Sequence, residues 1–173
     1  MKRMCITFFI IAIIVLCLIS VNLPQTTEKE YLRIHIRANS NDEPDQTVKY
    51  LVKSAVIEFL TPKIAECDTK QKAESMLIDS LSDIEAVANE VLKSEGFDYT
   101  SKAGVRNENF PTRKYGDLTL DGGFYDALII ELGTGTGDNW WCVVYPPLCF
   151  IGNGTGYRYK SKIKEIIDSF FNK

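Results

Sequence analysis

The residues with the most evident capacity for chemistry are His35, the only histidine of the chain, and the cysteines Cys142 and Cys149. A cysteine nucleophile with a histidine base is the minimum that a cysteine hydrolase needs. No local signature of such an enzyme surrounds these residues. His35 also alternates with Arg33 and Arg37 along a predicted strand, on the side that we expect to face solvent. We therefore predict no catalytic residue in this chain.

Other clusters of polar residues do not match known metal or phosphate sites. A structural zinc site would have to gather His35 and three cysteines from distant parts of the chain. The acidic residues at 42–45 lack the spacing and the glycine of an EF-hand, which favours a role at a helix N-terminus. The glycines at 133–137 are followed by neither a lysine nor a helix, so we expect a turn there. We expect no metal and no cofactor.

Hydrophobic periodicity predicts the elements that must position these residues. Leu32, Ile34 and Ile36 alternate with polar residues, as in a half-buried strand, and apolar residues at helical spacing predict amphipathic helices. Without strict alternation of helices and strands, the order favours an α+β fold, with a mostly antiparallel sheet packed by two or three helices. The expected strands are residues 31–37, 99–106, 124–132 and 140–145; the expected helices are residues 46–60, a longer one between Asp68 and Gly96, and residues 163–171.

The connections between these elements are also predicted. Pro62 should end the first helix, because proline cannot donate a backbone hydrogen bond. Residues 107–123 are expected to form a long loop or a broken strand, and residues 133–139 a hairpin between neighbouring strands. The candidate capping boxes at the start of the first helix are Ser40 with Glu43, or Asp42 with Asp45.

The N-terminus predicts export. Lys2 and Arg3 precede an apolar run at residues 4–21, which as a helix would span roughly the ~30 Å hydrocarbon core of a bilayer. Positive residues before such a run keep the N-terminus in the cytoplasm, so the rest would lie outside. Residues 1–23 are therefore a single-pass anchor or a cleaved signal peptide. Residues 24–30 would be a linker, and residues 31–173 one extracytoplasmic domain.

The charge balance argues against nucleic acid as a partner. The chain has 173 residues and a formal net charge of −3 at pH 7. Without the two basic residues of the N-terminal segment, 18 basic and 23 acidic residues remain, a balance of −5. This acidic balance also disfavours docking to anionic lipid through a polybasic patch. A membrane is expected only through residues 1–23.

Cys142 and Cys149 are the natural disulfide pair in an oxidising extracytoplasmic space, which would leave Cys67 unpaired. Seven fully extended residues cover roughly 23 Å, whereas a disulfide needs Cα atoms within about 7 Å of each other. The bridge can form only if Pro146 and Pro147 lie in a reversal. Two buried free thiols are the alternative.

Trp140 and Trp141, the only two tryptophans, begin a run that is apolar on both faces up to Tyr145. Such a run is typical of a strand covered on both sides, and Pro146 and Pro147 end it. A central core strand is one interpretation. Because only one of two adjacent rings can face a given core layer, a role for the other ring at an interface is the second.

Three stretches of unusual sequence resemble one known family. They are Arg33-Ile34-His35-Ile36-Arg37-Ala38-Asn39-Ser40-Asn41-Asp42 with Asp45-Gln46, Phe110-Pro111-Thr112-Arg113 with Tyr115-Gly116, and Asn139-Trp140-Trp141-Cys142 with Pro146-Pro147-Leu148-Cys149-Phe150. On these residues the chain resembles the stage II sporulation protein R family of endospore-forming bacteria, from about Tyr31 to its C-terminus. It departs from the family at Leu120-Asp121-Gly122-Gly123, where a Leu-Pro-Ala-Gly-like turn is usual.

The resemblance implies a signalling protein that is not an enzyme. Family members are made in the forespore and exported into the space between forespore and mother cell. There they trigger a mother-cell membrane aspartic protease, stage II sporulation protein GA. This protease removes the inhibitory pro-sequence of sporulation sigma factor E.

We expect this chain to contact the membrane-embedded protease through its polar turn and its Trp-Pro region. The residues of that expected surface are Asn39, Ser40, Asp42, Asp45, Trp140, Trp141, Pro146, Pro147 and Leu148. The alternative is an extracytoplasmic cell-wall binding or remodelling protein, with the tryptophans stacked on sugar rings. A redox protein that uses Cys142 and Cys149 is a third hypothesis.

Overall fold

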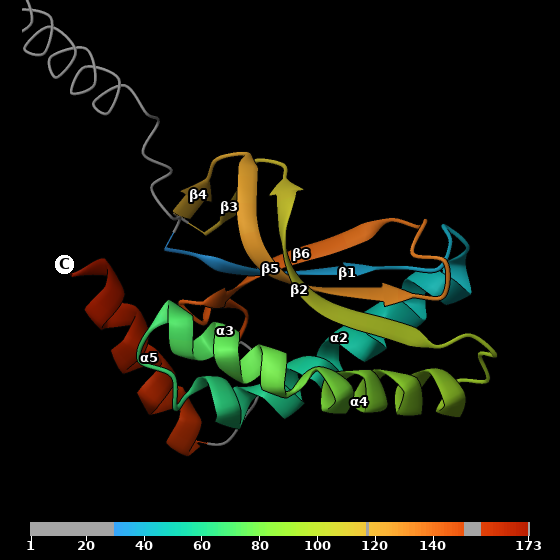
Figure 1. Ribbon diagram of the computed structural model, residues 1–173, viewed down its shortest axis with the longest axis horizontal. Coiled ribbons are helices and arrows are strands. Elements are labelled where there is room, and N and C mark those ends of the chain that lie inside the picture. Colours follow the sequence, from blue (N-terminus) through green and yellow to red (C-terminus); the bar gives the residue numbers. More distant parts are fainter. Residues whose placement is uncertain (1–29, 117, 151–156, 173) are drawn as a thin grey trace, which may run out of the picture.

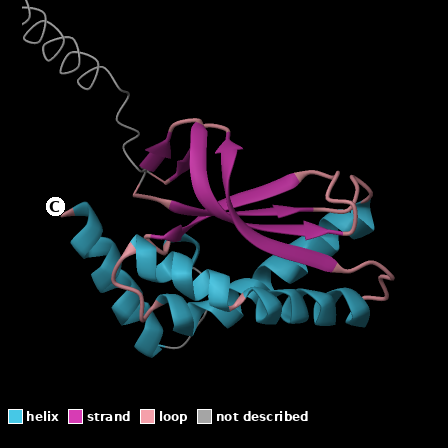
Figure 2. Cartoon of the chain, in the orientation of Figure 1, coloured by secondary structure: helices cyan, strands magenta, loops and turns pink. Residues whose placement is uncertain are grey.

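Strand β1 (Leu32–Arg37) lies inside a four-stranded sheet, because it pairs with a strand on each side. It runs parallel to β5 (Gly123–Leu132) and antiparallel to β6 (Asn139–Tyr145). β2 (Ser101–Phe110) pairs with the other side of β5 in antiparallel fashion, so the order is β2-β5-β1-β6. Helices cover one face of this sheet, as Figures 1 and 2 show.

The computed structural model describes residues 30–116, 118–150 and 157–172. The expected N-terminal segment, residues 1–23, and nearly all of the expected linker lie outside the described residues. Within the described ranges, no helix is long and apolar enough to cross a membrane. The fold class is α+β as expected, but the sheet is mixed, with a parallel pair at its centre.

The expected hairpin at residues 133–139 is wrong. β5 and β6 are not neighbours, because β1 lies between them, and residues 133–138 cross the end of β1 to connect the two strands. The Gly137 N–H donates to the Ala38 carbonyl at 2.9 Å, which ties the crossing chain to the end of β1. The alternation of apolar residues predicts a strand and its faces, but it does not say which strands are paired.

Among the described residues, four α-helices pack on the sheet or against its end, where two or three were expected. They are α2 (Glu43–Ile64), α3 (Lys70–Asp79), α4 (Leu81–Ser94) and α5 (Tyr157–Phe171). The long helix predicted between Asp68 and Gly96 is divided at Ser80, whose N–H bonds to the carbonyls of Met76 and Leu77. Gly96 follows the last turn of α4 with a φ of +82°, a conformation that suits glycine.

Both ends of α2 differ from expectation. The helix continues past Pro62 to Ile64. One turn before Thr61, the Ile57 carbonyl accepts a hydrogen bond from the Thr61 hydroxyl at 2.6 Å. Neither capping box forms, because Asp42 stands at the N-cap position without a side-chain cap bond. The Ser40 hydroxyl instead accepts the N–H of Asp42 at 3.1 Å. The backbone N–H groups of the first turn are therefore not capped by the acidic residues.

Residues 107–123 are more regular than expected. β2 continues to Phe110, and β3 (Arg113–Tyr115) pairs with β4 (Leu118–Leu120) in a small hairpin. Figure 1 shows this hairpin on the side of the sheet away from the helices. The sheet therefore has covering structure on both faces.

Two cores follow from this arrangement. The larger lies between the helices and the inner face of the sheet, and its centre includes Ile34, Ile36, Leu60, Leu128 and Ile130, all at most 1% exposed. The smaller lies on the outer face and is mostly aromatic; its buried members are Phe110, Tyr125, Ala127 and Ile129, with Tyr31 and Trp141 packed against them.

Because residues 133–138 cross the end of β1 closely, we predict that the stability of the fold depends on Gly137. A Cβ at this position would overlap the Ser40 carbonyl, whereas a Cβ on Gly104 in β2 would meet no atom within 4 Å. Gly137→Ala should lower the free energy of unfolding by about 1–3 kcal/mol. Gly104→Ala should change it by much less. Urea unfolding of both variants measures these changes. Equal losses of stability in the two variants would contradict the close packing of Gly137 against the end of β1.

Candidate functional site

Two of the three outward side chains of β1, those of Arg33 and His35, are buried, which corrects the expectation that they face solvent; Arg37 is partly exposed. Arg33 is 0% exposed and His35 is 4% exposed. The aromatic core on the outer face and the β3–β4 hairpin cover them. Alternation of apolar and polar residues does not distinguish solvent from a second, partly polar layer.

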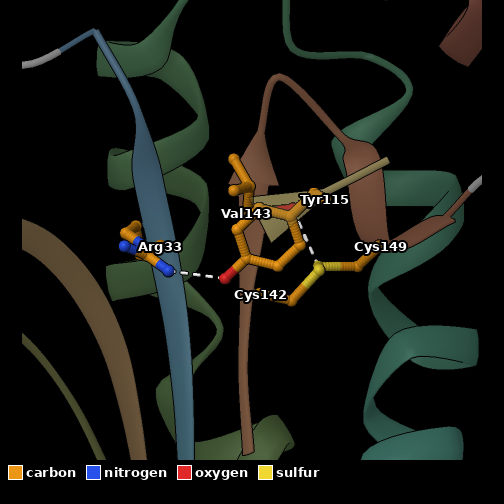
Figure 3. The surroundings of a disulfide bond; sticks show 5 residues. All are labelled: Arg33, Tyr115, Cys142, Val143 and Cys149. Atoms are coloured by element: carbon orange, nitrogen blue, oxygen red, sulfur yellow. Dashed lines mark hydrogen bonds between the residues drawn. A yellow bond between two sulfur atoms is a disulfide. The ribbon is translucent and has the colours of Figure 1, made fainter. Parts of the chain in front are cut away.

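Arg33 lies in an aromatic enclosure. Its guanidinium carbon is 4.3 Å from the ring centre of Phe110, 5.0 Å from that of Tyr125 and 5.6 Å from that of Tyr115. Arg33 Nη2 donates to the Tyr115 hydroxyl at 2.5 Å (Figure 3). Its Nε and Nη1 are buried without a hydrogen-bond partner. The pKa of Arg33 is lowered, mainly because the side chain is buried.

His35 belongs to a network of hydrogen-bonded polar and charged side chains on the same face. His35 Nδ1 lies 2.8 Å from Glu108 Oε1, which also accepts from Arg37 Nη2 at 2.5 Å. Arg37 Nη1 donates to Glu131 at 2.7 Å, and Arg106 Nη2 donates to the same carboxylate at 3.0 Å. These groups therefore form one hydrogen-bonded network across β1, β2 and β5, although His35 Nε2 is buried without a hydrogen-bond partner among the described residues.

Burial sets the protonation state of His35. It is the largest cause that lowers the pKa of His35, and it outweighs Asn139 and Glu108, which favour the protonated ring. Burial by itself raises the pKa of Glu108, but bonds from Arg37 and His35 outweigh it and the net shift is downward. At neutral pH the pair is a neutral imidazole beside a carboxylate.

The His35 ring is not placed to activate a cysteine. His35 stands opposite Trp141, and their rings are stacked at 5.3 Å. Cys142 stands opposite Ile34 and belongs to the helix-side core, so it lies on the other face of the sheet. Among the described residues, no group of three or more His, Cys, Asp or Glu side chains could hold a metal ion.

The polar turn after β1, residues 38–45, is bonded internally. Asn39 Nδ2 donates to Asp45 Oδ2 at 2.9 Å, and the Tyr99 hydroxyl donates to Asp45 Oδ1 at 2.5 Å. Burial raises the pKa of Asp45, but hydrogen bonds from Ser40, Tyr99 and Asn39 outweigh it, so the net shift is downward. Asp45 is buried, whereas Asp42 is exposed.

The same turn holds the β5–β6 crossing. Asn39 Oδ1 accepts the N–H of Thr134 at 3.0 Å, and the Asn39 carbonyl accepts the hydroxyls of Thr134 and Thr136 at 2.7 and 2.9 Å. Asn41 Oδ1 accepts the N–H of Asp138 at 2.6 Å. We call these contacts the Asn39 clamp. Whether residues of the turn also contact a partner stays a prediction.

Trp140 and Trp141 lie on opposite faces of β6. Trp140 packs against the helix-side core, and Lys53 Nζ of α2 is 5.8 Å from its ring centre. Trp141 packs on the outer face, where the guanidinium carbon of Arg113 is 4.1 Å from its ring centre. Each ring is partly exposed. β6 is an edge strand, so the expectation of a central strand is wrong.

The chain reverses after β6 and returns beside it. Cys142 and Cys149 form a disulfide with Cα atoms 6.0 Å apart (Figure 3). The Leu148 N–H bonds to the Pro146 carbonyl at 2.7 Å and begins the short helix η1 (Leu148–Phe150), so the required reversal is present. Pro146 and Pro147 are buried, and Leu148 is partly exposed. Cys67 is a buried free cysteine.

Two neighbours of the tryptophans were missed from the sequence. Arg113 stands in one of the unusual stretches and could have been singled out there. Lys53 has no such signal, because only the packing of α2 against β6 brings it to Trp140. The accessible side chains of this region are therefore aromatic and cationic.

Comparisons with known proteins agree with the resemblance noted above. The sequence model of the family described as Stage II sporulation protein R (spore_II_R) matches residues 28–155. The Stage II sporulation protein R of Bacillus subtilis (strain 168) is 33% identical over 143 residues. The alignment covers 83% of this chain and 64% of that relative, slightly less than two thirds of its length. No solved structure matches.

The buried His35 predicts a pH-dependent stability. Its folded pKa is lowered, so the unfolded chain binds the proton more readily as pH falls through the ordinary histidine range near 6.5. The free energy of unfolding should therefore decrease from pH 7 to 5.5, by at most about 1.4 kcal/mol per pH unit. Denaturant unfolding at several pH values measures this slope.

His35→Gln is the control for this pH series. The chain has no other histidine, so the variant should show a flat profile over the same pH range, whatever its absolute stability. A slope that persists in His35→Gln would contradict the assignment.

Proposed function

The chain belongs to the stage II sporulation protein R family, and from that premise we propose that it is an exported sporulation signal. It would pass from the forespore into the space between forespore and mother cell, through residues 1–23 as signal peptide or anchor. There it would activate the mother-cell membrane aspartic protease, stage II sporulation protein GA, which processes pro-sigma-E. Family membership is the observation that carries this proposal.

The arrangement of the charged residues supports a binding role over a catalytic one. His35 and the carboxylates of Glu108, Glu131 and Asp45 are each engaged by neighbouring side chains. Cys142 and Cys149 are joined to each other. The proposed activity needs no reaction at this domain. It needs only a surface that binds an active form of the protease more tightly than an inactive form.

We propose that this surface comprises the β6 region and the polar turn. The accessible candidates are Asp42, Trp140, Trp141 and Leu148, together with Ser40. Asn39 and Asp45 would contribute by holding the turn, because their side chains already bond to Thr134 and Tyr99. Pro146 and Pro147 would shape the loop that presents Leu148.

The cell-wall alternative receives less support. Sugar-binding by an aromatic pair needs two rings that line one surface, whereas Trp140 and Trp141 point to opposite faces of β6. Binding of the purified protein to peptidoglycan would nevertheless favour that alternative.

Reconstitution in a non-sporulating host tests the proposal. The chain, the protease and a tagged pro-sigma factor are co-expressed, with and without residues 4–21. We expect pro-sequence cleavage only when the chain is present and exported. Cleavage without the chain, or none with all three proteins folded, would contradict the proposal.

Substitutions in the same assay test the surface. Trp140→Ala and Asp42→Ala should each reduce cleavage, because they remove side chains from the proposed contact. Lys102→Ala, an exposed position on β2, serves as the control. Full processing by both test variants, when they are folded and exported, would show that the surface lies elsewhere.

A further inference from the structure

The outer edge of β6 offers unpaired backbone groups next to the two tryptophans. Successive residues of a strand direct their N–H and C=O groups to alternate sides. The Val143 carbonyl points away from β1, since it contacts Cys149 Sγ at 2.8 Å on the outer side of β6 (Figure 3). By alternation, Trp141 and Asn139 also direct their backbone groups outward. No described residue bonds to the backbone N–H or C=O of Trp141 on that side.

At the opposite edge of the sheet, the backbone donors at the start of β2 have partners. Along the first part of β2, the Ser101 N–H donates to Asn89 Oδ1 at 2.6 Å, and the Ala103 N–H donates to Glu85 Oε1 at 2.7 Å. Both acceptors belong to α4, so this helix satisfies the outward donors at the start of β2. On β6 the disulfide loop covers the edge at Val143, and none of the described residues covers the portion around Trp141.

Cationic side chains flank the open portion of β6 on both faces. Lys53 lies beside Trp140, and Arg113 lies over Trp141. The buried Arg33 lies on the same face as Arg113, close enough that the charge of Arg113 lowers the pKa of Arg33, after the larger effect of burial. Within the described part of the chain, none of these three cations has a carboxylate partner.

The geometry points to strand addition at β6: we propose that it binds an extended, acidic segment of the partner through the backbone groups of Asn139 and Trp141. Trp140 and Trp141 would pack against the apolar side chains of that segment, one ring on each face. Its carboxylates would pair with Arg113 and Lys53. Strand addition supplies backbone hydrogen bonds, and side chains on the two faces supply specificity. In the cell, and resting on the proposed function, the segment belongs to the extracytoplasmic part of the protease.

Charge argues for a foreign segment over a second copy of this chain. Pairing of two β6 edges would bring Arg113 and Lys53 of one copy towards the same residues of the other, and like charges oppose such pairing. Exposed edges flanked by cations are also a common protection against self-association. A second copy is therefore the alternative outcome of the test.

The first experiment uses probe peptides with the full chain in detergent micelles. The acidic probe is the blocked hexapeptide Glu-Glu-Val-Val-Glu-Glu, which presents both Glu and Val on each face of a strand, and the control probe carries Lys in place of Glu. Hydrogen exchange of the Trp141 amide and the NMR shifts of both indole N–H groups are recorded. We expect the acidic peptide alone to slow exchange at Trp141 and to shift both indole signals.

Three outcomes of this experiment would overturn the inference. They are no binding of the acidic peptide, equal binding of both peptides, or protection that lies away from residues 139–143. Protection of residues 139–143 that grows with protein concentration without peptide would assign the edge to a second copy. None of these outcomes depends on the protease, so they leave the proposed function untouched.

The second experiment uses the reconstituted cleavage assay. The double variant Lys53→Glu with Arg113→Glu should cleave roughly tenfold less than the wild type, because charge reversal repels an acidic segment. Lys102→Glu on β2 should cleave normally, and Arg113→Lys should retain most cleavage, which separates charge from folding. Full cleavage with the double variant would overturn the strand-addition inference and leave the proposed function standing. Absence of cleavage with the wild type would overturn the proposed function.

Discussion

The structure depends on the pairing of β1 with a strand on each side. Because β5 is parallel and β6 antiparallel to β1, the chain that connects them has to cross the end of β1. That crossing would leave backbone groups of residues 133–138 without partners unless something at the end of β1 accepts them. In the Asn39 clamp, the amide oxygens of Asn39 and Asn41 accept two of these N–H groups, and the Ala38 carbonyl beside the clamp accepts the N–H of Gly137.

In this sheet β6 pairs with β1 alone and is an edge strand. The sheet ends at β6, and the disulfide loop covers only one part of its outer side. On the outer face, aromatic rings and ion pairs enclose Arg33 and His35. The side chains of Arg33 and His35 are thus covered by other residues of the domain. The chain leaves an aromatic strand with cationic neighbours at the surface, which is the basis for both proposals.

The elements themselves were predictable from the sequence, but their pairing was not. The strands around Ile34, Leu128 and Val143 and the stop of α4 at Gly96 follow from local periodicity and glycine geometry. The parallel pairing of β1 with β5 depends on contacts between residues 94 positions apart, which no local pattern records. The burial of Arg33 and His35 depends on Phe110 and Tyr115, which arrive from other strands.

The candidate site was predictable only where local sequence patterns determine it. The alternation of Trp140 and Trp141 across β6 follows from the strand period, and the Cys142–Cys149 bridge required only a reversal at the prolines. The contacts of Lys53 with Trp140 and of Arg113 with Trp141 depend on how α2 and β3 pack against β6, which the sequence does not show. The acidic residues at 42–45 suggested helix capping, but the tertiary bonds of Asn39 and Tyr99 engage Asp45 instead.

The central claim is that the polar turn holds the crossing of β1, and the unfolding of Asn39→Ala tests it most directly. This change removes the bonds to Asp45 and to the Thr134 N–H. We expect the free energy of unfolding in urea to fall by about 2–3 kcal/mol. We also expect faster hydrogen exchange at residues 133–138. Wild-type stability in this variant, with loss of protease activation, would contradict the account and would make Asn39 a contact residue.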